Sequence, residues 1–142
     1  MINPAQKGGN MSEQITLETY LTGWDLLDPT IAATAGAVRA IADACADIAH
    51  RLACGSLTSD LSTEDSTDTP QGASKWANNR LITALKTASV RAIASDELEH
   101  PLFHDESAPI VVAFDPINCA VCLEANVPVG TIFSILSALA DK

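Results

Sequence analysis

Residues 114–124 read FDPINCAVCLE and lead directly into ANVPVGTIFSI, residues 125–135. This stretch begins at the end of a continuous apolar run, residues 110–114, and ends in a segment rich in β-branched and aromatic residues, 129–136. Runs of this length and composition predict two β-strands. An acidic residue, Asp115, and a Cys-x-x-Cys pair lie between them. The stretch therefore predicts two strands joined by a loop that carries a carboxylate and two thiols.

The same stretch resembles the metal and phosphate loop of class 1 fructose-1,6-bisphosphatases. In that family the loop typically reads F-D-P-L-D-G-S-S-N-I-D and continues x-N-V-x-V-G-T-I-F, and it aligns without a gap to residues 114–133. The resemblance covers residues 14–142. It implies an α+β fold similar to the N-terminal part of these enzymes, with helices layered on a mostly antiparallel sheet.

The resemblance also implies a metal site, but an altered one. Asp96 and Glu97 stand where the family has its S-E-E carboxylates, and Asp115 matches the first Asp of the loop. Ile117 keeps a backbone carbonyl that could face a metal, whereas Asn118 replaces the family's second Asp. Mg²⁺ prefers hard oxygen ligands, mostly carboxylates. We expect Asp96, Glu97, Asp115 and Ile117 to form only a vestigial metal site. In another motif of the family, the position of an aspartate is occupied here by Ser74.

The phosphate side of the loop departs further from the family. Cys119, Ala120, Val121 and Cys122 occupy the positions of Gly-Ser-Ser-Asn. In the family these small and hydroxylated residues cradle the phosphate that is cleaved. Cysteine adds bulk where glycine allows close backbone approach, and Ala120 and Val121 carry no hydroxyl.

The cysteines leave two interpretations open. Cys119 and Cys122 form a Cys-x-x-Cys, which can bind a metal or switch between thiol and disulfide states. The alternative is ordinary packing. Cys45 lies on an apolar helical stripe and is expected to be a buried thiol.

Composition indicates a single acidic domain. The 142 residues carry a net charge of −10, with only 8 Lys and Arg, and 47% are hydrophobic. Phosphate neutralisation needs clustered basic residues, so a nucleic-acid surface is excluded. No run approaches the roughly 20 apolar residues of a membrane span, and no signal-peptide pattern opens the chain. We expect a cytoplasmic protein with a flexible leader over residues 1–13 and a single truncated domain over residues 14–142.

Two helices are predicted before the strands. Asp28 and Pro29 are typical of a capped helix start, and apolar residues then recur at steps of three and four over residues 29–53. Gly55 is in position to end this helix. Residues 56–72 are rich in Ser, Thr, Asp, Pro and Gly and predict a surface loop. Helical spacing resumes over residues 73–88, and residues 90–94 predict a further strand.

The altered loop favours a non-catalytic function. We expect an interaction or regulatory protein that binds a protein partner, or a second copy, through the apolar segment 127–139, with no cofactor. Unpaired strand edges and exposed apolar patches invite such association. The alternative is a weak Mg²⁺-dependent phosphatase acting on fructose 1,6-bisphosphate, with metal held by Asp96, Glu97 and Asp115.

Overall fold

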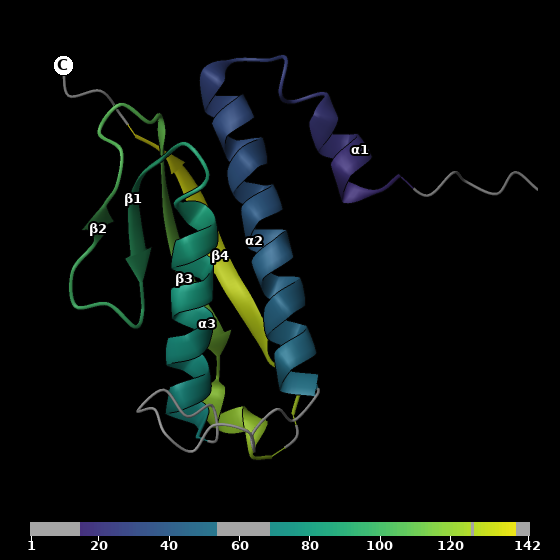
Figure 1. Cartoon of the computed structure of the whole chain (residues 1–142), viewed down its shortest axis with the longest axis vertical. Helices are drawn as coiled ribbons and strands as arrows, with labels where there is room; N and C mark the ends of the chain where they lie inside the picture. Colours follow the sequence, from purple (N-terminus) through teal and green to yellow (C-terminus); the bar gives the residue numbers. More distant parts are fainter. Residues whose placement is uncertain (1–14, 54–68, 126, 139–142) are drawn as a thin grey trace, which may run out of the picture.

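Helices lie on one side of a four-stranded sheet in the computed structural model, which describes residues 15–53, 69–125 and 127–138 (Figure 1). The expected α+β class is confirmed. The leader expected over residues 1–13 lies outside the described residues. The elements, in chain order, are α1 (Leu17–Thr22), α2 (Pro29–Ala53), α3 (Pro70–Leu85), β1 (Val90–Ser95), β2 (Leu102–Phe103), β3 (Ile110–Asn118), the 3-10 helix η1 (Ala120–Leu123) and β4 (Gly130–Ser137).

The first long helix, α2, has the predicted bounds, and Asp28 begins it as expected. The Asp28 carboxylate accepts a hydrogen bond from the Thr30 amide at 2.8 Å. Gly55, predicted to end it, lies outside the described residues. None of the helices in the described ranges is long and apolar enough to cross a membrane.

Helix α3 begins three residues before the predicted start at 73 and ends at Leu85 instead of 88. Its early start follows from Thr69, whose hydroxyl accepts a hydrogen bond from the Gly72 amide at 3.0 Å. Pro70 then occupies the first turn, where no amide donor is needed. Residues 70–72 therefore belong to a helix and not to the predicted loop, and residues 56–68 of that loop lie outside the described residues.

The strands run in the order β2-β1-β3-β4. The pairs β1–β2 and β3–β4 are antiparallel, whereas β1 and β3 are parallel, so the sheet is mixed and mostly antiparallel as expected. All three predicted strands are present with shifted ends, and β3 extends four residues further, to Asn118. The two-residue strand β2 was not predicted because so short a pairing leaves no periodic signal.

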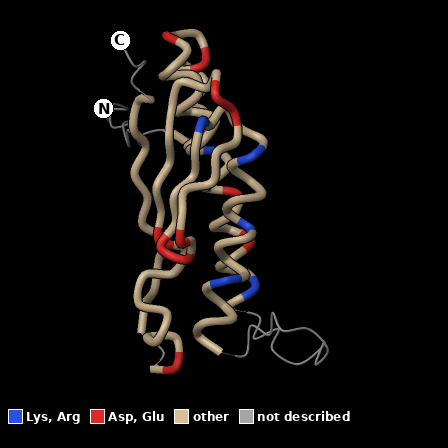
Figure 2. The backbone as a smooth tube through the Cα atoms, turned by 90° about the vertical axis from the view of Figure 1, so that its left-hand side faces the viewer, with Lys and Arg blue, Asp and Glu red and all other residues tan. Residues whose placement is uncertain are grey.

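The core lies between the helices and one face of the sheet (Figure 2). Small residues of α2, such as Ala37 and Ala44, are fully buried and let this helix approach α3 closely. Leu81 of α3 and Ile110 of β3 are also fully buried. Cys45, expected to be buried, is a free thiol that is only partly buried against this core. Two layers thus position the strand ends that carry the predicted site.

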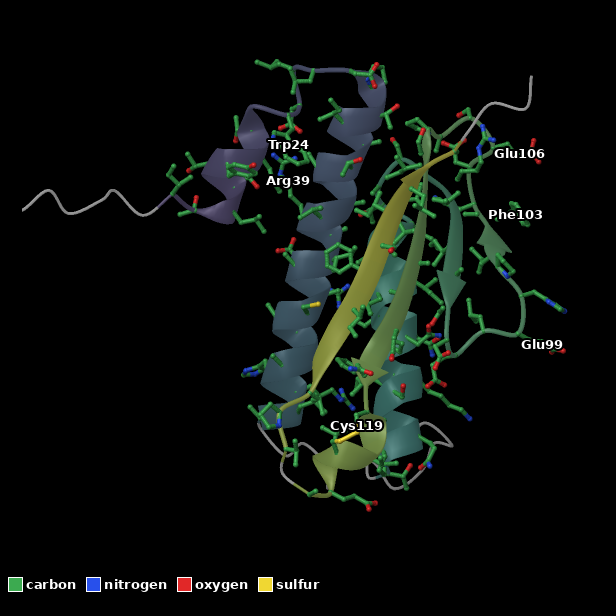
Figure 3. The ribbon with its side chains drawn as sticks, turned by 180° about the vertical axis from the view of Figure 1, so that it is seen from behind. Trp24, Arg39, Glu99, Phe103, Glu106 and Cys119 are labelled. Carbon is green, nitrogen blue, oxygen red and sulfur yellow. A yellow bond between two sulfur atoms is a disulfide. The ribbon has the colours of Figure 1, made fainter. Side chains whose placement is uncertain are left out.

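Helix α1 buries the side chain of Leu21 and is also held to α2 by ion pairs. The Arg39 guanidinium donates to Glu18 Oε2 at 2.8 Å and to both carboxylate oxygens of Asp25 at 2.9 Å. Figure 3 shows Arg39 pointing from α2 toward α1, beside Trp24. Hydrogen bonding to Arg39 lowers the pKa of Asp25.

Candidate functional site

Three of the predicted acidic residues are brought together at one end of the two central strands. Strands β1 and β3 are parallel, so the chain reaches the same edge of the sheet at the end of β1 as at Phe114 of β3. There the Asp96 amide donates to the Phe114 carbonyl at 3.1 Å. Asp96 and Glu97 therefore lie next to Asp115, as the sequence pattern predicts.

The charge state of Asp115 reflects this crowding. Partial burial raises the pKa of its carboxyl, and the negative charges of Asp96 and Glu97 raise it further. A hydrogen bond from the Ile117 amide acts in the opposite direction. Burial and neighbouring negative charges both disfavour the ionised form of a carboxylate, and Asp115 experiences both.

Ser74 joins this cluster from α3. Its side chain is buried, and its hydroxyl donates to Glu97 Oε1 at 2.6 Å. The sequence comparison marked Ser74 only as the position of a missing carboxylate. Its role as a donor that orients Glu97 emerges from the packing of α3 against β1, which no local pattern encodes.

Asn78 lies one helical turn after Ser74 and was not predicted as a site residue. It is 5% exposed, and its Oδ1 has no hydrogen-bond partner among the described residues. A buried amide oxygen without a donor is uncommon. The only sequence signal for it is an Asn on the apolar side of a predicted helix.

Two further positions of the family's metal loop lie near the end of β3 and differ in exposure. Ile117 is buried, whereas Asn118, at the end of β3, is exposed. Within the described ranges no group of three or more His, Cys, Asp and Glu side chains could hold a metal ion. Carboxylates, the donor type that Asp96, Glu97 and Asp115 supply, are the ligands that Mg²⁺ prefers.

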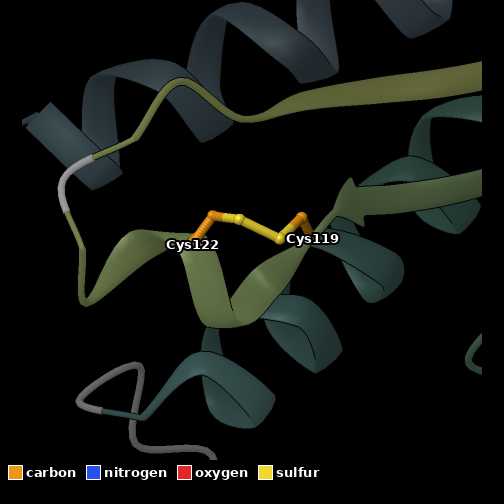
Figure 4. The surroundings of a disulfide bond; sticks show 2 residues. All are labelled: Cys119 and Cys122. Carbon is orange, nitrogen blue, oxygen red and sulfur yellow. A yellow bond between two sulfur atoms is a disulfide. The ribbon is translucent and has the colours of Figure 1, made fainter.

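The loop predicted to face phosphate forms a tight turn. Cys119 has a left-handed backbone, φ 61° and ψ 58°, and the short helix η1 follows it. A disulfide joins Cys119 to Cys122 across this turn (Figure 4). Val121 is 64% exposed and Ala120 packs against the core, so the two positions where the family has hydroxyls present only apolar groups.

A hollow between α2 and the strands that flank this loop is also apolar. A cavity of about 220 Å³ lies between α2 and the facing ends of β3 and β4. Its lining consists of Cys45, Ile48, Ala49, Leu52, Pro116, Ile117, Val129, Gly130 and Thr131. The lining contains no Asp, Glu, Lys or Arg, so no cationic side chain is present there to bind a phosphate.

The chain is similar to known proteins in both sequence and fold. No protein-family model matches the chain. It is 36% identical over 132 residues to the class 1 fructose-1,6-bisphosphatase of Azorhizobium caulinodans, an alignment that covers 89% of this chain and 40% of that enzyme. The class 1 enzyme of Bradyrhizobium diazoefficiens is 36% identical over 135 residues, covering 92% of this chain and 39% of its own length.

Solved structures agree on the fold. The crystal structure of Leishmania major fructose-1,6-bisphosphatase in its apo form superposes with a TM-score of 0.70 at 17% identity, covering 89% of this chain and 37% of that one. The T-state structure of the same enzyme gives a TM-score of 0.69 at 18% identity, covering 89% and 38%. The chain thus spans about 40% of the length of the curated relatives it matches.

Proposed function

The chain is a homologue of the class 1 fructose-1,6-bisphosphatases that matches only part of their length, and from this premise we propose that it is a non-catalytic interaction module that pairs with a second copy of itself. The observation that carries the proposal is an apolar face of the sheet that no described helix covers. Figure 3 looks onto this face.

The open face is identified from strand pairing. Ile110, Val112 and Phe114 of β3 point into the core, so Val111 and Ala113 between them point to the other side. Val111 pairs with Leu136 of β4 and with Ala92 of β1, which pairs with Phe103 of β2. One uncharged row therefore crosses all four strands, from Phe103 to Leu136. Phe103 is 74% exposed and Leu136 58%.

Strand β4 adds an edge with which no other described strand pairs. It is the outermost strand beside β3, and its eight residues include neither a charge nor a proline. Ile132, on the same face as Leu136, is 57% exposed. Natural proteins usually protect such edges with charges, prolines or bulges, because unpaired edge strands recruit further strands. An apolar edge and an apolar face meet at β4.

The uncharged row can accommodate a second copy without repulsion between the two acidic chains. The chain has a net charge of −10, so two copies that met through most of their surface would place carboxylates against carboxylates. The row from Phe103 to Leu136 has no charge and avoids this repulsion. A two-fold axis would also place β4 antiparallel to its own copy, which satisfies both edges at once.

The loop chemistry supports the non-catalytic part of the proposal. A metal-dependent phosphatase uses cation charge to hold both the attacking water and the departing phosphate. Here Asn118 is neutral where the family has an Asp. The neighbouring loop is a disulfide-bonded turn without hydroxyls. Both changes weaken the groups on which that chemistry depends.

Light scattering coupled to size-exclusion chromatography tests the assembly. We expect the chain to run at twice its formula mass, and Leu136→Lys to run as a folded monomer because its ammonium group would be buried in the interface. Asn79→Lys, which places the same charge on an exposed position of α3, should remain dimeric. A wild-type chain that is monomeric at all concentrations, including one that binds some other protein, would contradict pairing with a second copy.

The convergence of Asp96, Glu97 and Asp115 is the specific observation that favours the second candidate, a weak Mg²⁺-dependent sugar-phosphate phosphatase. Phosphate release from fructose 1,6-bisphosphate in millimolar Mg²⁺ or Mn²⁺ distinguishes the two functions. We expect the wild-type chain and Asp115→Ala to release phosphate at the same background rate. Turnover that Asp115→Ala abolishes would establish the enzyme and refute the non-catalytic proposal.

A further inference from the structure

The two cysteines of the loop are held side by side by the backbone as well as by their bond. The Cα atoms of Cys119 and Cys122 are 5.3 Å apart. The Cys122 amide donates to the Cys119 carbonyl at 2.8 Å, and the Cys122 carbonyl accepts from the amides of Ala125 and Val127 at 3.2 and 3.1 Å. These hydrogen bonds define the turn without help from the sulfur atoms, so a pair of thiols here would remain adjacent.

Packing on both sides imposes the same turn. Cys119 is the only non-glycine residue with positive φ in the described part of the chain. Such a backbone persists where its surroundings impose it. Strand β3 ends directly before Cys119, and η1 directly after it packs against α3, with Ala120 and Leu123 against the core. The geometry that pairs the cysteines is therefore a property of the fold, and it can survive reduction of the bond.

The pair is also accessible, and unequally so. Cys119 is exposed and Cys122 is half-buried, with the exposed apolar side chain of Val121 between them. Thiol–disulfide exchange requires an attacking thiolate to reach one sulfur of the bond. Figure 3 shows Cys119 at the end of the molecule, away from the covered core. Solution thiols should therefore reach the Cys119 sulfur more readily than that of Cys122.

We propose that Cys119 and Cys122 are a reversible dithiol/disulfide couple that exchanges with dithiols. The thiolate of an external dithiol attacks the Cys119 sulfur, which breaks the Cys119–Cys122 bond and forms a mixed disulfide. Cys122 leaves as a thiolate and takes a proton. The second thiol of the reductant, as its thiolate, then attacks the mixed disulfide at its own sulfur, forms the external disulfide and releases Cys119. Two electrons and two protons pass to the protein, and the reverse steps re-form its bond.

This exchange does not depend on pairing with a second copy. The experiments on the disulfide and on the oligomeric state can therefore fail independently of one another. The two cysteines lie at the positions that align with the phosphate loop of the family. Disulfides that are exposed to solution are the labile ones, whereas buried ones resist reduction. Exposure of Cys119 places this bond in the labile class.

A redox titration of the intact chain tests the proposal. The protein is equilibrated in mixtures of reduced and oxidised dithiothreitol, quenched in acid, alkylated and mapped by mass spectrometry. We expect both thiols to appear together in one two-electron transition, to return to the disulfide when the ratio is reversed, and to leave the circular dichroism spectrum unchanged. A bond that stays intact in fully reduced dithiothreitol under native conditions, or reduction that unfolds the chain, would overturn the proposal. Cys45→Ser, which removes a thiol outside the pair, should titrate as the wild type does.

Monothiol trapping tests whether the Cys119 sulfur is the more accessible of the two. In a Cys45→Ser, Cys54→Ser background, Cys122→Ser leaves only Cys119 and Cys119→Ser leaves only Cys122. With oxidised glutathione, Cys119 should form the mixed disulfide on the order of tenfold faster than Cys122, because the more exposed thiol reaches a glutathione sulfur more readily. Equal rates, or a faster Cys122, would contradict the greater accessibility of Cys119, on which its assignment as the attacked sulfur rests.

Discussion

At the residue scale, the pKa of Asp115 depends on its burial and on the two carboxylates beside it. Its pKa is raised by burial first and then by the charges of Asp96 and Glu97. Folding therefore disfavours the charged carboxylate relative to the unfolded chain, and the charged form costs stability at neutral pH. This cost is absent below the unfolded pKa, about 3.9 for Asp, and appears as the pH rises through the folded pKa.

Replacing this carboxylate should therefore stabilise the chain at neutral pH. We expect Asp115→Asn to raise the melting temperature at pH 7, and the gain to shrink toward zero as the pH falls below about 4. Thermal unfolding followed by circular dichroism at a series of pH values measures both effects. A lower melting temperature for Asp115→Asn at pH 7 would mean that the carboxylate is satisfied by partners other than those described.

Asp105 provides the control of opposite sign. Its carboxylate accepts hydrogen bonds from the Ser107 hydroxyl at 2.6 Å and from the Ser107 amide at 2.9 Å, and these bonds lower its pKa. Its contribution to stability is present at neutral pH and is lost as the pH falls through the folded pKa. Asp105→Asn should accordingly lower the melting temperature at pH 7 and have no effect in strong acid.

At the scale of elements, the start of α3 depends on one hydroxyl. Thr69 accepts the Gly72 amide, which would otherwise lack a partner in the first turn. We expect Thr69→Ala to reduce the free energy of unfolding by about 1 kcal/mol, as is typical for loss of an N-cap. Urea denaturation measures the change.

Thr83 offers a matched control within the same helix. Its hydroxyl donates to the Asn79 carbonyl at 2.8 Å, and its side chain is exposed. Because alanine has the higher helix propensity and the carbonyl keeps its backbone partner, Thr83→Ala should change stability by less than about 0.5 kcal/mol. Equal losses for Thr69→Ala and Thr83→Ala would show that the cap does not set the start of α3.

At the scale of the whole molecule, some apolar side chains are buried in the core and others are exposed to solvent. Leu81 is fully buried between the helices and the sheet, whereas Leu26, in the α1–α2 connection, is 88% exposed. Leu81→Ala should cost about 2–5 kcal/mol, a large part of the roughly 5–15 kcal/mol by which such domains are stable. Leu26→Ala should cost less than about 0.5 kcal/mol. Urea unfolding of both variants measures this contrast. Similar losses of unfolding free energy would contradict a core that lies only between the helices and one face of the sheet.

The sequence alone determined the elements whose signals are local and repeated. The bounds of α2 followed from a cap and an apolar stripe that recurs over seven turns, and the β3 and β4 runs were apparent from their β-branched residues. The family loop at Asp115 likewise carried a contiguous pattern. The start of α3 was also encoded locally, in Thr69 and Pro70, but this cap lies within a segment whose composition predicts a loop.

Only the tertiary structure decided which distant residues meet. The parallel pairing of β1 with β3 brings Asp96 to Asp115, and the packing of α3 places the Ser74 hydroxyl on Glu97. The choice between packing and a disulfide for Cys119 and Cys122 was open in the sequence, because the spacing allows both and the turn of η1 selects one. The open face from Phe103 to Leu136 was likewise hidden, since a strand pattern shows which residues alternate but not which face of the sheet the helices cover.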